Sequence, residues 1–169
     1  MQEQKELRYN YRFSRKVWIY SMIYLFGVIL LAIALYFLYE GGYFSAWFSS
    51  SIMALLLLSS LSIPRKISLN DNHLRIYCLM DITEIDIKEI SSVRKVDNSE
   101  MKGIIPLFAG FGFFGYYGHY LDVIQVERVL IYASEWNNFV EITDIYERRI
   151  YLSCKEANEL VAEIEKRIE

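Results

Sequence analysis

The sequence predicts an α+β protein in which an N-terminal transmembrane helical hairpin precedes a bent antiparallel sheet, or partly open barrel, capped by one C-terminal helix. Residues 17–63 form two long apolar runs in which Glu40 is the single charged residue. From residue 64 onward, apolar and polar side chains alternate as they do in half-buried strands. We therefore expect a basic cytoplasmic N-terminal segment (1–16), a two-span hairpin (17–63) and a cytoplasmic domain (64–169).

Charge is distributed unevenly along the 169 residues, of which 54% are hydrophobic. Residues 1–16 hold five basic and two acidic side chains, whereas residues 64–169 hold 13 basic and 18 acidic ones. Binding to nucleic acid needs a basic surface, so the acidic domain disfavours that function. The two cysteines do not form a disulfide framework and are compatible with a reducing compartment.

The first predicted span, Val17–Tyr39, is an uncharged run of about 23 residues, and roughly 20 suffice to cross a bilayer core. Aromatic residues lie toward its two ends, as in the aromatic belts of membrane proteins: Trp18, Tyr20, Tyr36 and Tyr39. Ala32-Ile33-Ala34 resembles the cleavage site of a signal peptide. The apolar run continues past Ala34, however, and a second run follows, which favours a retained span.

The second predicted span, Tyr43–Ile63, is separated from the first by Glu40-Gly41-Gly42 and ended by Pro64. Serines dilute it, and such serines hydrogen-bond within their own helix or to a neighbouring one: Ser45, Ser49, Ser50, Ser51, Ser59, Ser60 and Ser62. A buried hairpin of a soluble protein is the alternative, but two uncharged runs of this length disfavour it.

Basic residues flank the open end of the hairpin on both sides: Arg8, Arg12, Arg15, Lys16, Arg65 and Lys66. The connecting turn has none, so the positive-inside rule predicts a multi-pass protein of the bacterial cytoplasmic (inner) membrane with both termini in the cytoplasm. We also expect these six side chains to contact anionic lipid headgroups. A role in setting orientation alone is the alternative, and the two roles are compatible.

The domain is predicted to contain short strands separated by polar turns. Alternating apolar residues mark the strands: Ile67 and Leu69; Leu74, Ile76 and Cys78; Ile85 and Ile87; Val129, Ile131 and Ala133; Val140 and Ile142; Ile150 and Leu152. Ile90, Val93 and Val96 continue the pattern at looser spacing. Turns are expected at residues 70–72, 137–138 and 144–149.

One amphipathic helix is predicted to close the chain. Ser153 and Glu156 have the spacing of a capping box, in which Ser153 is the N-cap. Apolar residues then recur on one helical face, which we expect to pack against the sheet: Ala157, Leu160, Val161, Ile164 and Ile168.

The segment Gly103–Asp122 is the most unusual stretch, because it alternates glycine with phenylalanine and tyrosine. Gly110, Gly112 and Gly115 match the G-x-G-x-x-G pattern of dinucleotide sites, but the residues that follow are poor helix formers. A third membrane span over residues 104–120 would separate strands that should pair. A glycine-bent strand and loop, whose aromatic side chains pack on the domain or a partner, is the favoured interpretation.

The run Phe108-Ala109-Gly110-Phe111-Gly112-Phe113-Phe114-Gly115-Tyr116-Tyr117-Gly118 follows a membrane hairpin and several strands, and precedes further strands and a closing helix. This order resembles bacterial pleckstrin-homology-like (PH-like) domain proteins with an N-terminal membrane anchor, over roughly residues 64–167. The Arg and Thr positions common after the aromatic segment are not clear in this chain. The resemblance implies a seven-stranded, strongly bent sheet capped by one helix, and it does not imply phosphoinositide binding.

The residues indicate no catalytic, metal or cofactor site. His73 and His119 lack neighbouring ligands at metal-site spacing, and Asp81, Glu84 and Asp86 indicate a solvated strand face. Neither span contains an ionisable residue of the kind that marks ion pathways, which argues against a channel or transporter. A membrane enzyme is the minor alternative, which would depend on residues such as Glu84, His119 or Cys154.

We therefore expect a non-enzymatic protein that presents a protein- or lipid-interaction domain at the inner face of the membrane. The candidate interaction surface is aromatic: Phe111, Phe113, Phe114, Tyr116 and Tyr117. Packing of these rings inside the domain is the competing interpretation. Expected partners are the lipid bilayer and either another protein or a second copy of the chain. The alternative function is that of a small structural subunit of a larger membrane complex, assembled through the hairpin.

Overall fold

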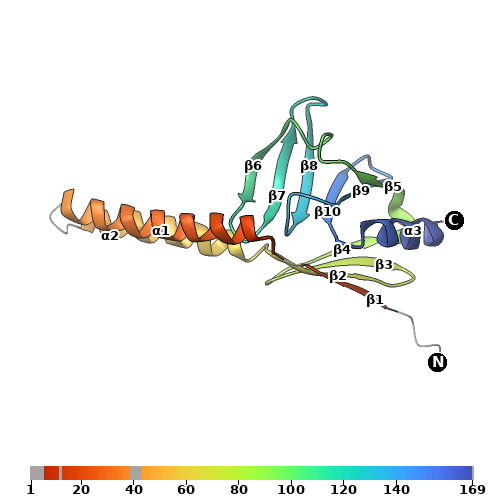
Figure 1. The fold of residues 1–169 in the computed structure, drawn as a ribbon, viewed down its shortest axis with the longest axis horizontal. Helices are drawn as coiled ribbons and strands as arrows, with labels where there is room; N and C mark the ends of the chain where they lie inside the picture. The colour runs from red at the N-terminus through yellow and green to blue at the C-terminus, as the bar shows by residue number, and fades with distance from the viewer. Residues whose placement is uncertain (1–5, 12, 39–42, 169) are drawn as a thin grey trace.

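The computed structural model of the chain describes residues 6–11, 13–38 and 43–168 (Figure 1). Strand β1 (Leu7–Asn10) precedes helices α1 (Arg15–Leu38) and α2 (Tyr43–Ser60), which extend side by side away from the domain. The domain then contains, in order, β2 (Pro64–Leu69), β3 (His73–Cys78), β4 (Ile82–Asp86), the short 3₁₀ helix η1 (Ile87–Glu89), β5 (Ile90–Val96), β6 (Ile104–Phe111), β7 (Tyr116–Asp122), β8 (Glu127–Ala133), β9 (Phe139–Asp144), β10 (Arg149–Ser153) and α3 (Ala157–Ile168).

The strands form two sheets, so the single seven-stranded sheet implied by the resemblance is corrected. One sheet has four antiparallel strands in the order β1-β2-β3-β4, and the other has six in the order β5-β9-β10-β8-β7-β6. Strands β8 and β10 are parallel neighbours, and every other pair in the six-stranded sheet is antiparallel. The chain leaves the first sheet at η1, where the Asp86 carboxylate accepts a hydrogen bond from Lys88 N. Neither sheet closes into a barrel.

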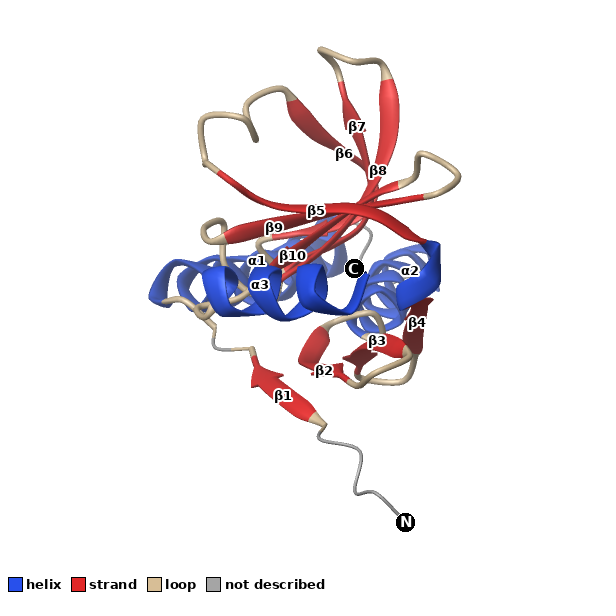
Figure 2. Cartoon of the chain, turned by 90° about the vertical axis from the view of Figure 1, so that its right-hand side faces the viewer, coloured by secondary structure: helices blue, strands red, loops and turns tan. Residues whose placement is uncertain are grey.

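The main core lies where the four-stranded sheet, α3 and one face of the six-stranded sheet meet (Figure 2). Leu69, Leu74, Ile142, Leu152 and Leu160 are all fully buried there. These are positions that the alternating and helical patterns predict to be apolar and inward-facing. The predicted turns are also present, and Asn138 between β8 and β9 has the left-handed backbone (φ +53°) that asparagine tolerates.

The capping residue predicted for the last helix is wrong. Helix α3 begins at Ala157, and Ser153 is instead the last residue of β10. The Ser153 hydroxyl accepts a hydrogen bond from Ser134 N (2.9 Å), so it joins the end of β10 to the segment after β8. The predicted apolar face of the helix is correct, since Ala157, Leu160 and Ile164 are buried.

Strand β1 lies within the segment that the sequence analysis treats only as a basic N-terminal region. It pairs with β2 across the helical hairpin, and the register places Leu7 opposite Leu69 and Asn10 opposite Lys66. Tyr9 is buried in the main core. The chain therefore enters and leaves the two helices through neighbouring strands of one sheet.

The two N-terminal helices differ in how well they match a membrane span. Residues Arg15–Phe37 of α1 are long and apolar enough to cross a membrane, and they are the one such segment among the described residues. The apolar stretch of α2, Ala46–Leu58, is shorter, and α2 ends before the predicted limit at Ile63. The predicted break at residues 40–42 lies outside the described residues.

Candidate functional site: the junction of α1 with the aromatic–glycine hairpin

The aromatic–glycine hairpin consists of β6, β7 and the turn at residues 112–115. Gly112 N donates to Gly115 O (2.8 Å) across the turn, and both glycines have positive φ. A Cβ atom on Gly115 would lie 2.7 Å from Ala133 O of the neighbouring strand β8, which is closer than a side chain can approach. Because β7 follows the turn directly, the segment is neither a helix-dependent dinucleotide site nor a third membrane helix.

A buried serine joins α1 to this turn. Ser21 is fully buried, and its hydroxyl accepts a hydrogen bond from Phe114 N (2.8 Å). The same hydroxyl donates to Val17 O (2.8 Å), one helical turn earlier, and lies 3.3 Å from Gly112 O. Phe114 has a left-handed backbone (φ +50°), so this hydrogen bond holds a strained residue in place.

Aromatic rings pack around the same contact. The Phe114 ring meets Phe13 and Trp18 edge-to-face, with centroid distances of 6.4 and 6.1 Å. The Phe113 ring meets Tyr24 in the same manner at 6.3 Å. The side chains on the turn therefore pack against α1 and the residues before it, which fixes the start of the helix against the domain.

Burial divides the five aromatic residues predicted as an interaction surface. Phe113, Tyr116 and Tyr117 are buried, and the Tyr117 hydroxyl donates to Phe113 O (2.9 Å). Phe114 is half-buried, and Phe111 is 47% exposed. A free surface at this hairpin would thus include Phe111 but would not include the three buried rings. Sequence reasoning omitted Phe108, which is 87% exposed and follows a register shift in β6 after Pro106.

The predicted basic residues come from three elements at the base of the helices. Arg15 and Lys16 are exposed in the first turn of α1, and Arg65 is exposed in β2. Lys66 Nζ lies 4.3 Å above the centre of the Tyr77 ring. Arg8 in β1 pairs with Glu6, and Arg12 lies outside the described residues.

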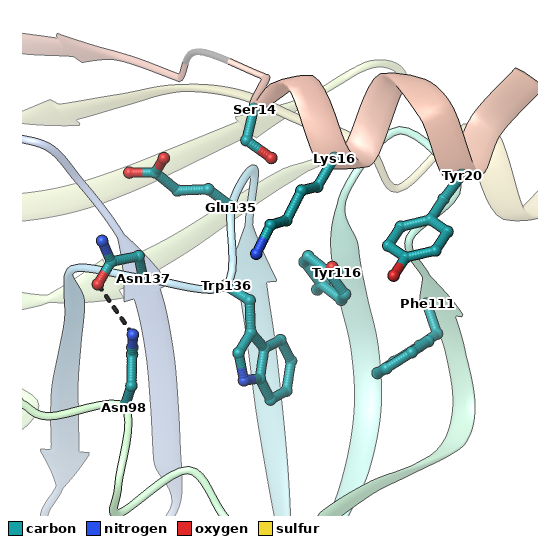
Figure 3. A pocket seen from close by; sticks show the side chains of 9 residues that line it. All are labelled: Ser14, Lys16, Tyr20, Asn98, Phe111, Tyr116, Glu135, Trp136 and Asn137. Carbon is teal, nitrogen blue, oxygen red and sulfur yellow. Dashed lines mark hydrogen bonds between the residues drawn. The ribbon is translucent and has the colours of Figure 1, made fainter.

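A pocket of about 590 Å³ opens beside the junction (Figure 3). It is lined by the start of α1, the aromatic–glycine hairpin, the β5–β6 connection and the β8–β9 connection: Ser14, Lys16, Tyr20, Asn98, Phe111, Tyr116, Glu135, Trp136 and Asn137. Trp136 forms one wall, with its ring centroid 4.8 Å from that of Tyr116 and 5.3 Å from that of Phe139. Asn98 Nδ2 donates to Asn137 Oδ1 (3.1 Å) at the rim. The pocket combines aromatic walls with one cationic side chain, Lys16, one anionic side chain, Glu135, and neutral polar groups.

No catalytic arrangement emerges among the residues that the structure describes. They contain no group of three His, Cys, Asp or Glu side chains placed to hold a metal ion. Burial raises the pKa of the Cys154 thiol to about 12, so it is not an activated nucleophile. The Glu84 carboxylate pairs with Arg75 (2.8 Å) on an exposed strand face, and this hydrogen bond lowers its pKa. His119 is exposed on β7.

Taken together, the two sheets and the C-terminal helix that packs between them define an α+β domain. The sequence comparison is specific about the family. Residues 65–168 match the family described as Bacterial PH domain, which is more than half of the chain, so the chain belongs to that family. PH domains are generally non-catalytic interaction modules. Comparisons with curated proteins and with solved structures each found no significant match.

Proposed function

We propose that this chain is a membrane-anchored, non-enzymatic PH-like interaction module at the inner face of a bacterial cytoplasmic membrane. The observation that carries the proposal is the uncharged, exposed surface of α1 beyond its contact with the domain. Large apolar side chains along the helix remain exposed: Phe26, Ile29, Leu30, Ile33 and Phe37. An apolar surface of this extent marks an interface with lipid or protein rather than with water.

The pairing of β1 with β2 supports two crossings of the membrane instead of one. Residues on either side of the helices, Asn10 and Lys66, are partners in the same sheet. The chain between them must therefore cross a bilayer an even number of times, so α2 returns if α1 crosses. A helix of 18 residues is about 27 Å long, close to the roughly 30 Å of a hydrocarbon core.

The hydrogen bonds at Ser21 support a rigid attachment of the module to its anchor. A domain on a flexible linker would sample many orientations, whereas one fixed to the first turns of α1 presents the same face to its surroundings. On this proposal the pocket beside Trp136 opens at the level where α1 leaves the membrane. The expected partner there is a protein or a second copy of the chain.

Topology is tested by cysteine labelling in intact bacterial cells with a membrane-impermeant maleimide. Tyr43→Cys lies at the start of α2, and Tyr146→Cys lies in the exposed β9–β10 turn. The native thiols of Cys78 and Cys154 are buried, so the chain without an added cysteine measures the background labelling. We expect labelling at position 43 in intact cells and at position 146 only after lysis. Labelling at position 146 in intact cells would refute the proposed orientation.

The exposed leucines of α2 favour a second candidate, a subunit of a larger complex assembled through the helices. Leu55, Leu57 and Leu58 are all more than 60% exposed, on a helix whose apolar stretch is short for a lone span. A photo-crosslinking amino acid at Leu57 is compared with one at Trp136. Stoichiometric crosslinks to another protein at position 57 alone would favour the subunit. Crosslinks at position 136 alone would favour the module.

A further inference from the structure

We propose that strand β6 is a second membrane contact, lying along the bilayer surface so that the edge of the six-stranded sheet meets the lipid headgroups. This inference rests on the proposed membrane anchoring and adds to it a particular orientation of the domain. The contact surface, which we call the β6 edge, comprises Ile105, Leu107 and Phe108.

The composition of β6 is unusual for a strand at the end of a sheet. It has a single neighbour, β7, and residues 103–118 contain no charged side chain. Soluble proteins normally protect such an edge with charged residues, because an apolar edge invites association. The absence of charge along this edge indicates that something other than water covers it.

The exposed side chains of the β6 edge are apolar. Phe108 is 87% exposed, and Ile105 and Leu107 are 46% and 42% exposed. These exposures contrast with Tyr116 and Tyr120 of the neighbouring strand, which are buried in the second core cluster of the domain. Phe108 is the most exposed of the three, so most of its side chain lies outside the packing of the domain.

The position of β6 relative to the helices identifies the bilayer as the occupant. Strands β6, β7 and β8 of the six-stranded sheet run across the direction of α1 and α2, and β6 is the one of the three nearest to the side toward which the helices extend (Figure 1). Helix α2 contacts β6 directly. Ser62, two residues beyond the end of α2, lines a small pocket together with Phe108.

Phe108 therefore lies at the depth where α2 ends, which is the interfacial region of a bilayer if the helices span it. Aromatic side chains favour that region. The apolar surface of the helices and the β6 edge then form one continuous lipid-facing surface. The exposed Arg15 and Arg65 at the base of the helices would lie beside anionic headgroups at the same level.

Pairing of β6 with a second copy of the chain is less compatible with the strand itself. Pro106 has no backbone N–H, and the register shifts between Pro106 and Phe108. Both features interrupt the regular row of donors and acceptors that edge-to-edge pairing requires. Binding at this edge would therefore be made by its side chains rather than by backbone hydrogen bonds.

Depth-dependent fluorescence quenching on the full chain tests the contact. Three variants, Phe108→Cys, Ile29→Cys and Tyr146→Cys, are each labelled with a nitrobenzoxadiazole maleimide and reconstituted into phosphatidylethanolamine–phosphatidylglycerol vesicles. Burial raises the pKa of the Cys78 thiol to about 11, so the native cysteines react slowly at neutral pH. The vesicles contain lipids with a nitroxide either near the headgroup or deep in the acyl chain.

We expect position 108 to lose fluorescence to the shallow nitroxide, position 29 to the deep one, and the exposed control at position 146 to neither. Quenching at 29 without quenching at 108 would overturn the β6 contact and leave the anchoring intact. An absence of quenching at both positions 29 and 108 would instead contradict the proposed anchoring itself. A blue-shifted emission at 108 that depends on protein concentration in detergent, without quenching in vesicles, would assign the edge to a second copy.

Discussion

At the residue scale, glycine is required in the aromatic–glycine hairpin because backbone from a neighbouring strand occupies the space of a side chain. Gly115 combines φ +131° with a carbonyl oxygen 2.7 Å from the position of a Cβ atom. Gly118 on β7 faces Phe108 O in the same way at 2.6 Å. The glycines therefore permit close approach of strands as well as an unusual backbone angle.

Substitution Gly115→Ala should lower the free energy of unfolding by about 1–3 kcal/mol, because it adds backbone strain and a steric clash. The matched control is Gly27→Ala on α1, where a Cβ atom would meet nothing within 4 Å. Denaturant unfolding of the full chain in detergent micelles, followed by tryptophan fluorescence, measures the difference. Equal midpoints for the two variants would contradict the assigned role of Gly115.

Ser21 is the residue on which the attachment of α1 depends. Replacement by alanine leaves the Phe114 amide without its acceptor, at a cost of about 1–3 kcal/mol for a buried group. We expect faster hydrogen exchange at the Phe114 amide in Ser21→Ala, while amides in β9 stay protected. The exposed Tyr20→Phe variant is the control, and unchanged exchange at Phe114 in Ser21→Ala would exclude the proposed contact.

At the element scale, β1 binds the N-terminal segment to the domain. Tyr9 is buried between β1 and α3, and its hydroxyl lies 3.4 Å from the Glu159 carboxylate. Burial and the neighbouring Glu159 raise the pKa of Tyr9 to about 12. The four-residue strand β1 is thus held in place by the buried Tyr9 side chain and by its backbone pairing with β2.

Substitution Tyr9→Ala should destabilise the domain by about 3–5 kcal/mol, the range for removing a buried aromatic side chain. Arg8→Ala, one residue earlier, removes an exposed ion pair with Glu6 and should leave stability nearly unchanged, because water screens such a pair. Thermal unfolding monitored by circular dichroism compares the two. If both variants melt together with the parent chain, β1 is not an integral strand.

The predictable elements are those whose signal is local. The turn at residues 70–72 follows from Asn70, whose side-chain oxygen accepts hydrogen bonds from Asn72 N and His73 N. The apolar face of α3 follows from its helical spacing. By contrast, β1 was not predicted. Leu7 and Tyr9 alternate with Arg8 and Asn10, but four residues are too few to distinguish a strand by pattern alone, and the partner strand β2 lies beyond two helices. The Ser153 hydroxyl likewise serves a contact with Ser134 that is distant in sequence.

The candidate site was predictable in composition but not in geometry. The run of glycine and aromatic residues correctly marks a glycine-bent segment that packs on its surroundings. Which rings are buried depends on the docking of α1 through Ser21 and on Trp136, and neither contact has a local signature. The residue types alone therefore could not distinguish the buried Tyr117 from the exposed Phe108.

At the scale of the whole molecule, a partly buried network of charged side chains joins strands of the six-stranded sheet. Arg149 on β10 lies 3.0 Å from Asp122 on β7 and 3.1 Å from Glu127 on β8. Burial acts to raise the pKa of Asp122, but hydrogen bonds from Gln125 N, Arg149 and Ile124 N lower it by more, so that its pKa lies below the usual 3.8.

Because the pKa of Asp122 is lower in the folded chain than in the unfolded one, its contribution to stability is present above the unfolded value and is lost as the pH falls. Asp122→Asn should lower the free energy of unfolding by about 1–3 kcal/mol at pH 7. Its stability should also fall less steeply than that of the parent chain between pH 5 and pH 3. Parallel pH profiles from denaturant titrations would show that Asp122 is not the titrating group.

The pairing of β1 with β2 has a consequence for how the chain is made. Leu7 leaves the ribosome about 60 residues before its partner Leu69, and at about 5–20 residues per second this delay lasts about 3–12 seconds. During that interval both helices are synthesised, while the β1 segment has no strand to join. The N-terminal sheet can therefore be completed only after both helices have been synthesised. Under the proposed anchoring, insertion of the helices can begin before the domain closes.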